Sequence, residues 1–219
     1  MTTRVLLIRH GATVLSAEDR FAGATDVALS EEGQNQARSL GERLAQLELA
    51  AVYASPMQRT MTTATFVAAP HQLQLVTDPG LREIDHGRWE QLTRREVEQR
   101  FPDEYANWEA DPFTFAPEGG ESGLSVMARA LPVIRRIVVA NAGKTVAVVS
   151  HKATIRLVLC SLLGIDARGY RDRLDQSPAC LNVLDFKDPV RARLVVYNDT
   201  SHYTAHPAQS QSRLSNWWG

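Results

Sequence analysis

Short apolar runs recur along the chain and predict buried strands. The runs at residues 4–8 (RVLLI), 51–54 (AVYA) and 145–149 (TVAVV) are rich in aliphatic side chains. Apolar runs of this length are typical of strands that are covered on both faces of a sheet. Two more candidates, 181–186 and 193–197, come late and close together. We therefore expect them to form a hairpin at one edge of the sheet.

Longer segments between these runs predict helices, because their apolar residues recur every three or four positions. The segments are 31–47, with Ser30 as a candidate N-cap, 57–67, 124–139 and a stretch that follows His151 and ends at Gly164. Strands that alternate with helices favour an α/β fold. The prediction is a three-layer α/β/α arrangement, in which helices cover both faces of a mainly parallel central sheet.

The alternation is interrupted at about residues 88–122, where aromatic side chains, prolines and charges are mixed. We interpret this stretch as a helical excursion from the sheet that caps the functional site; the alternative is a surface insertion with its own aromatic cluster. Residues 1–203 then form a single domain. Residues 204–219 are polar and without periodicity, so we expect a loose C-terminal tail.

Composition excludes several classes of protein. The 24 basic and 25 acidic residues of the 219-residue chain give a net charge of -1, which disfavours a nucleic-acid-binding protein. No apolar run approaches the ~20 residues that span a membrane. Arg9 interrupts the apolar stretch near the N-terminus after four residues, which argues against a secretory signal. Cys160 and Cys180 are too few for a zinc site or a disulfide framework. We expect a cytoplasmic protein with no membrane or nucleic-acid partner. The sequence leaves open whether the chain forms a homodimer.

Two of the predicted strands end in histidine. The first runs into Arg9-His10-Gly11 and the third into His151-Lys152. Ligands bind beyond the carboxyl ends of parallel strands, so both imidazoles are expected at one edge of the sheet. Each histidine alone would more often be structural.

Two further charged residues are candidates for the same edge. Arg59 lies in the first turn of the helix that follows the second strand, near a helix N-terminus that favours anions. Glu83 lies in a short apolar context, Leu-Arg-Glu-Ile. Taken singly, each could equally be a solvated surface residue.

Together these five residues suit phosphoryl transfer without a metal. Arginine side chains bind phosphate oxygens in a bidentate manner. A neutral histidine can attack phosphorus, and a carboxylic acid can protonate the leaving oxygen.

Five ordered segments resemble the histidine phosphatase superfamily, which is also called phosphoglycerate mutase-like. They cover about residues 4–203 and read Leu-Ile-Arg-His-Gly with the Phe-Ala-Gly and Leu-Ser-Glu-Glu-Gly that follow it, Ser-Pro-Met-Gln-Arg-Thr at 55–60, Leu-Arg-Glu with Gly-Arg-Trp-Glu at 81–90, Gly-Gly-Glu-Ser at 119–122, and Ser-His at 150–151. The resemblance implies a phosphoglycerate mutase-like fold with a helical cap and with no metal or cofactor.

The resemblance also implies a role for each of the five residues. His10 would be the nucleophile that becomes phosphohistidine. Arg9, Arg59 and His151 would bind the phosphoryl group and stabilise its charge in the transition state. Glu83 would protonate the leaving oxygen and then deprotonate the attacking water.

The chain departs from the family pattern at several positions. Ser16 stands where many members have asparagine; it can still donate one hydrogen bond to phosphate. Ala22 lacks a hydroxyl that many members have, and Ala12 replaces a glutamate or glutamine. Lys152 replaces glycine after the second histidine. Its ammonium group either extends into solvent or leans over the pocket toward a second negative group of the substrate.

The leading prediction is therefore a metal-independent phosphomonoesterase that acts on a small phosphorylated metabolite through a phosphohistidine. One alternative is a cofactor-dependent phosphoglycerate mutase. Mutases of that type resemble longer chains with an additional segment after the acid-bearing glutamate, whereas Gly87 follows Glu83 almost directly here. A second alternative is a non-catalytic member of the family that binds a phosphorylated ligand; retention of all five residues disfavours it.

Overall fold

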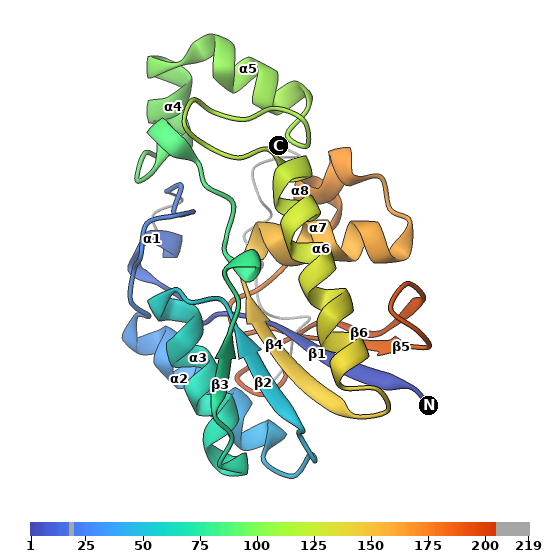
Figure 1. Cartoon of the computed structure of the whole chain (residues 1–219). Helices are drawn as coiled ribbons and strands as arrows, with labels where there is room; N and C mark the ends of the chain where they lie inside the picture. The colour runs from blue at the N-terminus through green and yellow to red at the C-terminus, as the bar shows by residue number, and fades with distance from the viewer. Residues whose placement is uncertain (18–19, 205–219) are drawn as a thin grey trace.

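A six-stranded sheet forms the centre of the molecule in the computed structural model, which describes residues 1–17 and 20–204 (Figure 1). The strands lie in the order β3-β2-β4-β1-β5-β6. Their bounds are β1 Thr3–Arg9, β2 Ala51–Ala54, β3 Leu75–Thr77, β4 Thr145–Ser150, β5 Leu181–Phe186 and β6 Ala192–Asp199.

The sheet is mainly parallel, as predicted. β1 pairs in parallel with β4, and β2 pairs in parallel with both β4 and β3. β5 is antiparallel to β1, and β6 is antiparallel to β5. The two late strands thus form the expected hairpin at one edge.

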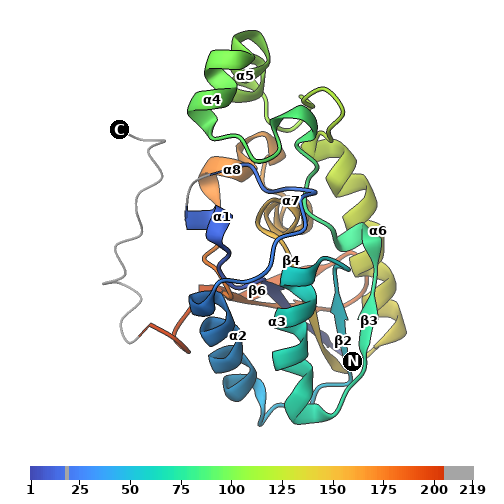
Figure 2. The ribbon, with the colours of Figure 1, turned by 90° about the vertical axis from the view of Figure 1, so that its left-hand side faces the viewer.

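Helices cover both faces of the sheet and give the three predicted layers (Figure 2). Side chains alternate between the two faces along a strand. Leu6 and Ile8 of β1 therefore pack in a core with α2 and α3, while Val5 and Leu7 pack in the core that includes α6 and α7. The helices are α1 Val14–Ala17, α2 Glu31–Leu44, α3 Gln58–Ala68, α4 Arg94–Arg100, α5 Pro102–Ala110, α6 Gly123–Ala140, α7 Lys152–Leu163 and α8 Tyr170–Arg173.

The ends of the helices follow the chemistry of their flanking residues. Ser30 caps α2 as expected, because its hydroxyl oxygen accepts a hydrogen bond from the Gly33 amide. The helix ends at Leu44, before the predicted Leu47; Leu47 is exposed and adds no core contact. Gly164 ends α7 in the left-handed conformation, with φ of 68°, which glycine adopts without strain.

The stretch between β3 and α6 carries the short helices α4 and α5, which lie together at one end of the molecule (Figures 1 and 2). These helices have their own apolar cluster, formed by Phe21, Trp89, Val97 and Trp108. Phe21 comes from the segment between α1 and α2, so the cluster joins the excursion to that segment. The stretch is therefore both a cap and an insertion with its own aromatic cluster.

No helix in the described ranges is long and apolar enough to cross a bilayer. The predicted tail lies almost entirely outside the described residues.

Candidate active site

The two strand-end histidines meet at the carboxyl edge of the sheet. β1 and β4 are in parallel register, with Arg9 beside Ser150, so His10 and His151 follow at equivalent positions. The His10 amide donates a hydrogen bond to the Ser150 carbonyl oxygen at 3.1 Å. The centroids of the two imidazole rings lie 5.2 Å apart. The expectation that both histidines reach one edge is confirmed.

A close approach of two glycines explains two of the sequence motifs. Gly11 follows His10, and Gly33 lies in the first turn of α2. A Cβ atom on Gly11 would lie 2.3 Å from the Gly33 carbonyl oxygen, which no real contact allows. Only glycine at both positions lets the helix pack against the loop that carries His10.

The structure fixes the tautomer of His10. Its Nδ1 lies 2.7 Å from the Gly11 carbonyl oxygen, which can only accept a hydrogen bond. Nδ1 therefore carries the proton, and in the neutral ring Nε2 keeps its lone pair. Burial, followed by the charges of Arg9 and Arg59, lowers the pKa of His10 well below its ordinary value. The ring is neutral near pH 7.

Arg59 is a buried residue, only 2% exposed, rather than a solvated arginine. Its guanidinium group donates to the carbonyl oxygens of Ala22, Gly23 and Thr25 and thereby holds the loop of the Phe-Ala-Gly motif. Its Nε donates to Nδ1 of His151 at 3.2 Å. Arg59 lines a pocket at this edge together with Arg9, His10 and Glu83.

His151 lies behind Arg59. Because Nδ1 accepts from Arg59, Nε2 carries the proton and donates to the Ser55 hydroxyl at 2.8 Å. The side chain is fully buried, and it is absent from the described lining of the pocket. Burial and the charge of Arg59 lower the pKa of His151 well below its usual range. In this arrangement His151 contacts Arg59, whereas the resemblance implies direct contact with the phosphoryl group.

Arg9 is supported by a buried polar network. Its Nη1 donates to the Gln176 carbonyl oxygen at 2.6 Å, whereas its buried Nε has no partner in the described structure. The side chain of Gln176 in turn bonds Asn182 and the thiol of Cys180. Burial raises the pKa of Cys180 to about 12, so its thiol stays protonated. The network holds the Arg9 guanidinium group at the edge of the pocket.

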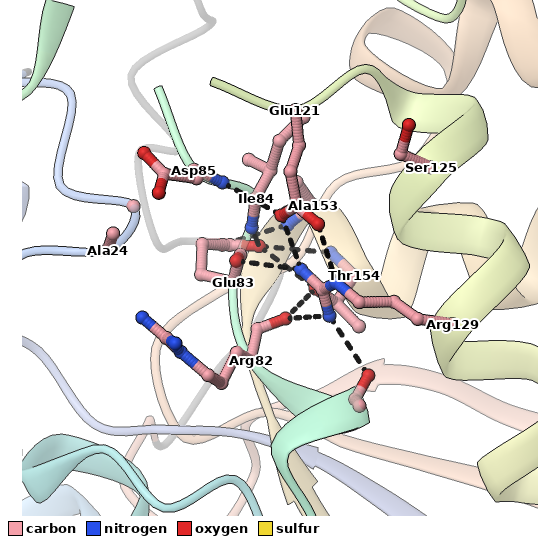
Figure 3. A network of polar contacts seen from close by, with 12 residues as sticks. Ala24, Arg82, Glu83, Ile84, Asp85, Glu121, Ser125, Arg129, Ala153 and Thr154 are labelled. Carbon is pink, nitrogen blue, oxygen red and sulfur yellow. Dashed lines mark hydrogen bonds and ion pairs between the residues drawn. The ribbon is translucent and has the colours of Figure 1, made fainter. Parts of the chain in front are cut away.

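The Glu83 carboxylate is held at the N-terminus of α7 (Figure 3). Its two oxygens accept hydrogen bonds from the amides of Ala153 and Thr154, each at 3.1 Å. Amides at a helix N-terminus have no partner within the helix, so they can donate to these oxygens. Glu83 is therefore held in a defined orientation beside the pocket and is not an ordinary surface carboxylate.

Arg129 of α6 holds the loop that carries Glu83 (Figure 3). Its guanidinium group donates to the carbonyl oxygens of Gly80, Arg82 and Glu83, each at 2.9 Å. It also makes a bidentate pair with Glu121 at 2.8 and 2.7 Å. Burial opposes ionisation of Glu121, but the bonds from Arg129 outweigh it and lower the pKa of that carboxyl. All five N–H donors of Arg129 are thus engaged.

The structure describes the side chain of Lys152 but not that of Ser16. Lys152 is half-buried and lines the pocket, which favours the interpretation in which its ammonium group faces the substrate. Ser16 belongs to α1, but its side chain lies outside the described atoms. Its hydrogen bond to phosphate stays a prediction.

The structure adds several residues that sequence reasoning did not single out: Ser55, Gln176, Asn182, Arg129 and Arg156. Ser55 and Arg129 had a signal in the sequence. Ser55 is the first residue of the motif that contains Arg59. Arg129 pairs with Glu121, which lies in the Gly-Gly-Glu-Ser motif. Arg156 also lines the pocket. No cluster of three or more His, Cys, Asp or Glu side chains with the arrangement of a metal site occurs among residues 1–17 and 20–204.

Comparison with known proteins now adds to this geometry. The family model of the histidine phosphatase superfamily (branch 1) matches residues 5–200. The chain belongs to this superfamily. The match includes Arg9, His10, Arg59, Glu83 and His151.

Individual histidine phosphatases show the same likeness. Phosphoserine phosphatase 1 of Hydrogenobacter thermophilus is 33% identical over 163 residues, which are 74% of this chain and 77% of the relative. The bifunctional protein Rv2228c of Mycobacterium tuberculosis is 37% identical over 202 residues; these cover 91% of this chain but only 55% of that longer protein. The solved structure of Bacillus stearothermophilus YhfR superposes with a TM-score of 0.85 at 30% identity and covers 91% of this chain and 98% of its own.

Proposed function

We propose that this histidine phosphatase is a metal-independent phosphomonoesterase that hydrolyses a small phosphorylated metabolite. The observation that carries the proposal is the state of His10. Its ring is buried and neutral, its Nδ1 is hydrogen-bonded to the Gly11 carbonyl oxygen, and Arg9 and Arg59 line the same pocket. A neutral imidazole with a free Nε2 is the form that attacks phosphorus.

In the first step the Nε2 lone pair of His10 forms a bond to phosphorus while the bond to the ester oxygen breaks. The leaving alkoxide takes a proton from the carboxylic acid form of Glu83. Arg9 and Arg59 stabilise the charge on the equatorial phosphoryl oxygens in the transition state. The unpartnered Nε of Arg9 is a donor available for this contact.

In the second step water attacks the phosphohistidine. Glu83, now a carboxylate, accepts a proton from the water as the bond between phosphorus and Nε2 breaks. Inorganic phosphate leaves, and both His10 and Glu83 return to their starting states. His151 positions Arg59 during both steps. It could contact the phosphoryl group directly only if its Nε2–H broke the hydrogen bond to Ser55 and donated to a phosphate oxygen instead.

Two observations favour a phosphatase over a mutase. The segment after Glu83 is short and folds at once into the turn at Gly87–Trp89. The relative from Hydrogenobacter thermophilus is named as a phosphatase of phosphoserine, a small phosphorylated metabolite.

Rapid quenching without acid tests the proposal. With a phosphorylated substrate we expect an acid-labile phosphoprotein in the wild type and none in His10→Ala. His71→Ala is the matched control, because His71 lies in the turn after α3 and is not part of the pocket lining. Inorganic phosphate should be released without a bisphosphorylated primer. Turnover without a trapped intermediate, together with an active His10→Ala, would refute the mechanism; faster interconversion of 2- and 3-phosphoglycerate than phosphate release would favour the mutase.

A further inference from the structure

One wall of the pocket carries positive charge that the transferred phosphoryl group does not require. Lys152 and Arg156 lie one turn apart at the start of α7, and both line the pocket. Side chains four residues apart project from the same face of a helix. The wall is therefore built from adjacent cationic side chains on one rigid element.

Arg156 is the most unusual part of this wall. The residue is 8% exposed and its side chain is 10% exposed, so the side chain is nine-tenths buried. Its only ion pair in the described structure is a loose one, with Nη2 lying 3.6 Å from Asp175. Its buried Nε has no hydrogen-bond partner. A buried donor without an acceptor is unfavourable, so the arrangement suits an acceptor that a ligand supplies.

Lys152 occupies an equally unfavourable position in the free protein. It is the first residue of α7, where the positive end of the helix dipole opposes a cation. Burial, followed by the charges of Arg9 and Arg156, lowers its pKa to about 7. An anion bound between these side chains would remove the repulsion.

The balance of charge in the pocket indicates how much negative charge is required. The described lining contains six arginines and one lysine but only one acid, Glu83. Arg20 and Arg171 pair with Glu96 and Glu109, and Arg156 has Asp175. A phosphoryl dianion balances Arg9 and Arg59, and Arg94 lies over the Trp108 ring of the cap. The ammonium of Lys152 is then the charge beside Arg156 that a further negative group of the substrate can meet.

We infer that Lys152 and Arg156 form a second anion subsite, which binds a carboxylate on the leaving group of the substrate. The inference rests on the proposed phosphatase function and narrows its substrates to phosphate esters of hydroxy acids. Lys152 supplies the charge, and Arg156 supplies the Nε donor.

Three esters test the inference. 3-Phosphoglycerate and glycerol 3-phosphate differ only in a carboxylate against a hydroxymethyl group. Propane-1,3-diol bisphosphate offers a second phosphate instead. We expect the wild-type kcat/KM to favour 3-phosphoglycerate over glycerol 3-phosphate by about tenfold or more, the range of a charge-assisted hydrogen bond. The bisphosphate should be a poorer substrate than 3-phosphoglycerate.

Variants of Lys152 and Arg156 test whether these residues cause the preference for 3-phosphoglycerate over glycerol 3-phosphate. Lys152→Met and Arg156→Met should each reduce the ratio of kcat/KM values by about tenfold, because the loss on 3-phosphoglycerate exceeds the loss on glycerol 3-phosphate. Arg156→Lys keeps a charge but lacks Nε, so it should lose part of the preference. Lys144→Met and Arg135→Met are matched controls at exposed positions and should leave the ratio unchanged. If Arg156→Met does not fold, the half-buried Lys152 still provides the decisive variant.

Each other outcome overturns a defined statement. Equal losses on both monoesters would place the two residues at the transferred phosphoryl group, and unchanged kcat/KM values on both monoesters would remove them from binding. A preference for the bisphosphate would contradict the carboxylate. If the wild type hydrolyses glycerol 3-phosphate without preferring 3-phosphoglycerate, only the subsite fails. If it hydrolyses none of these esters and not p-nitrophenyl phosphate, the proposed function itself fails.

Discussion

Arg129 lies outside the lining of the pocket, yet it should control how well Glu83 works as an acid. In Arg129→Met, the carbonyl oxygens of the Glu83 loop and the Glu121 carboxylate lose their shared partner. We expect kcat to fall by about 10- to 100-fold, because a displacement of ~1 Å in a catalytic group can have this effect.

The leaving group distinguishes positioning from general damage. In the proposed mechanism the leaving group of an alkyl phosphate takes a proton from Glu83, whereas p-nitrophenolate leaves without one. The loss in kcat should therefore be large for glycerol 3-phosphate and small for p-nitrophenyl phosphate, with Arg135→Met as the control. Equal losses on the two substrates would contradict a positioning role.

The pH dependence of substrate preference should follow the protonation of Lys152. Burial, Arg9, Arg156 and Arg94 lower its pKa to about 7, and Asp175 acts in the opposite direction. As pH rises through 7 the ammonium group loses its proton, so the ratio of kcat/KM for 3-phosphoglycerate over glycerol 3-phosphate should fall between pH 6 and 8.5. This ratio reports the free enzyme, and the ionisation of the phosphate cancels. Lys152→Arg stays charged and should show a flat ratio; a flat ratio in the wild type would rule out this titration.

The residues that sequence could identify are those at strand ends and in motifs. Arg9, His10 and His151 could be identified from the sequence, because they follow predicted parallel strands whose carboxyl ends lie at the same edge of the sheet. Arg156 and Arg129 were not, because each lies within an apolar helical pattern and its partners, Asp175 and Glu121, come from other segments. Whether such an arginine faces solvent or a pocket depends on how helices are packed, which the local pattern does not contain.

Among the elements, the packing of the cap helices α4 and α5 depends on Trp108. Its ring lies 5.5 Å from Phe21 and 5.7 Å from Trp89, and the Arg171 guanidinium group stacks 4.0 Å from its centroid. Trp108→Ala should cost about 3–5 kcal/mol of local stability. Because this cluster is separate from the two sheet cores, we expect faster hydrogen exchange over residues 94–110 with little change in β4.

Trp108→Ala should also raise KM, because the Trp108 ring contacts Phe21 and Arg171 and both of these residues line the pocket. Trp108→Phe keeps an aromatic ring and is the matched control. Equal loss of protection in the cap and in β4 would show that the cap does not loosen independently.

Most of the elements could be predicted from the sequence, and the exceptions are instructive. The strands with continuous apolar runs were found because burial on both faces leaves no other pattern. β3 was missed: it has only three residues, two of them exposed, and it is a strand only because it pairs with β2. Tertiary pairing, rather than local preference, determines such a short edge strand.

For the whole molecule, the chemistry should not depend on a metal ion. In the pocket the arginines supply the positive charge that Mg²⁺ provides in other phosphoryl transfer enzymes. We expect kcat/KM to be unchanged, within about twofold, after dialysis against EDTA. Loss of activity that Mg²⁺ or Zn²⁺ restores would contradict this expectation.

The position of β1 in the sheet has a consequence for how the protein is made. β1 lies between β4 and β5, so both of its neighbours come from residues 145–150 and 181–186. On the ribosome, the strand that leads to His10 is synthesised before either neighbour, and its apolar side chains have no sheet to join. A nascent chain arrested before residue 145 should leave this segment open to chaperones and proteases. His10 is thus translated before the strands that flank β1, and it reaches its place at the edge of the sheet only after they have been made.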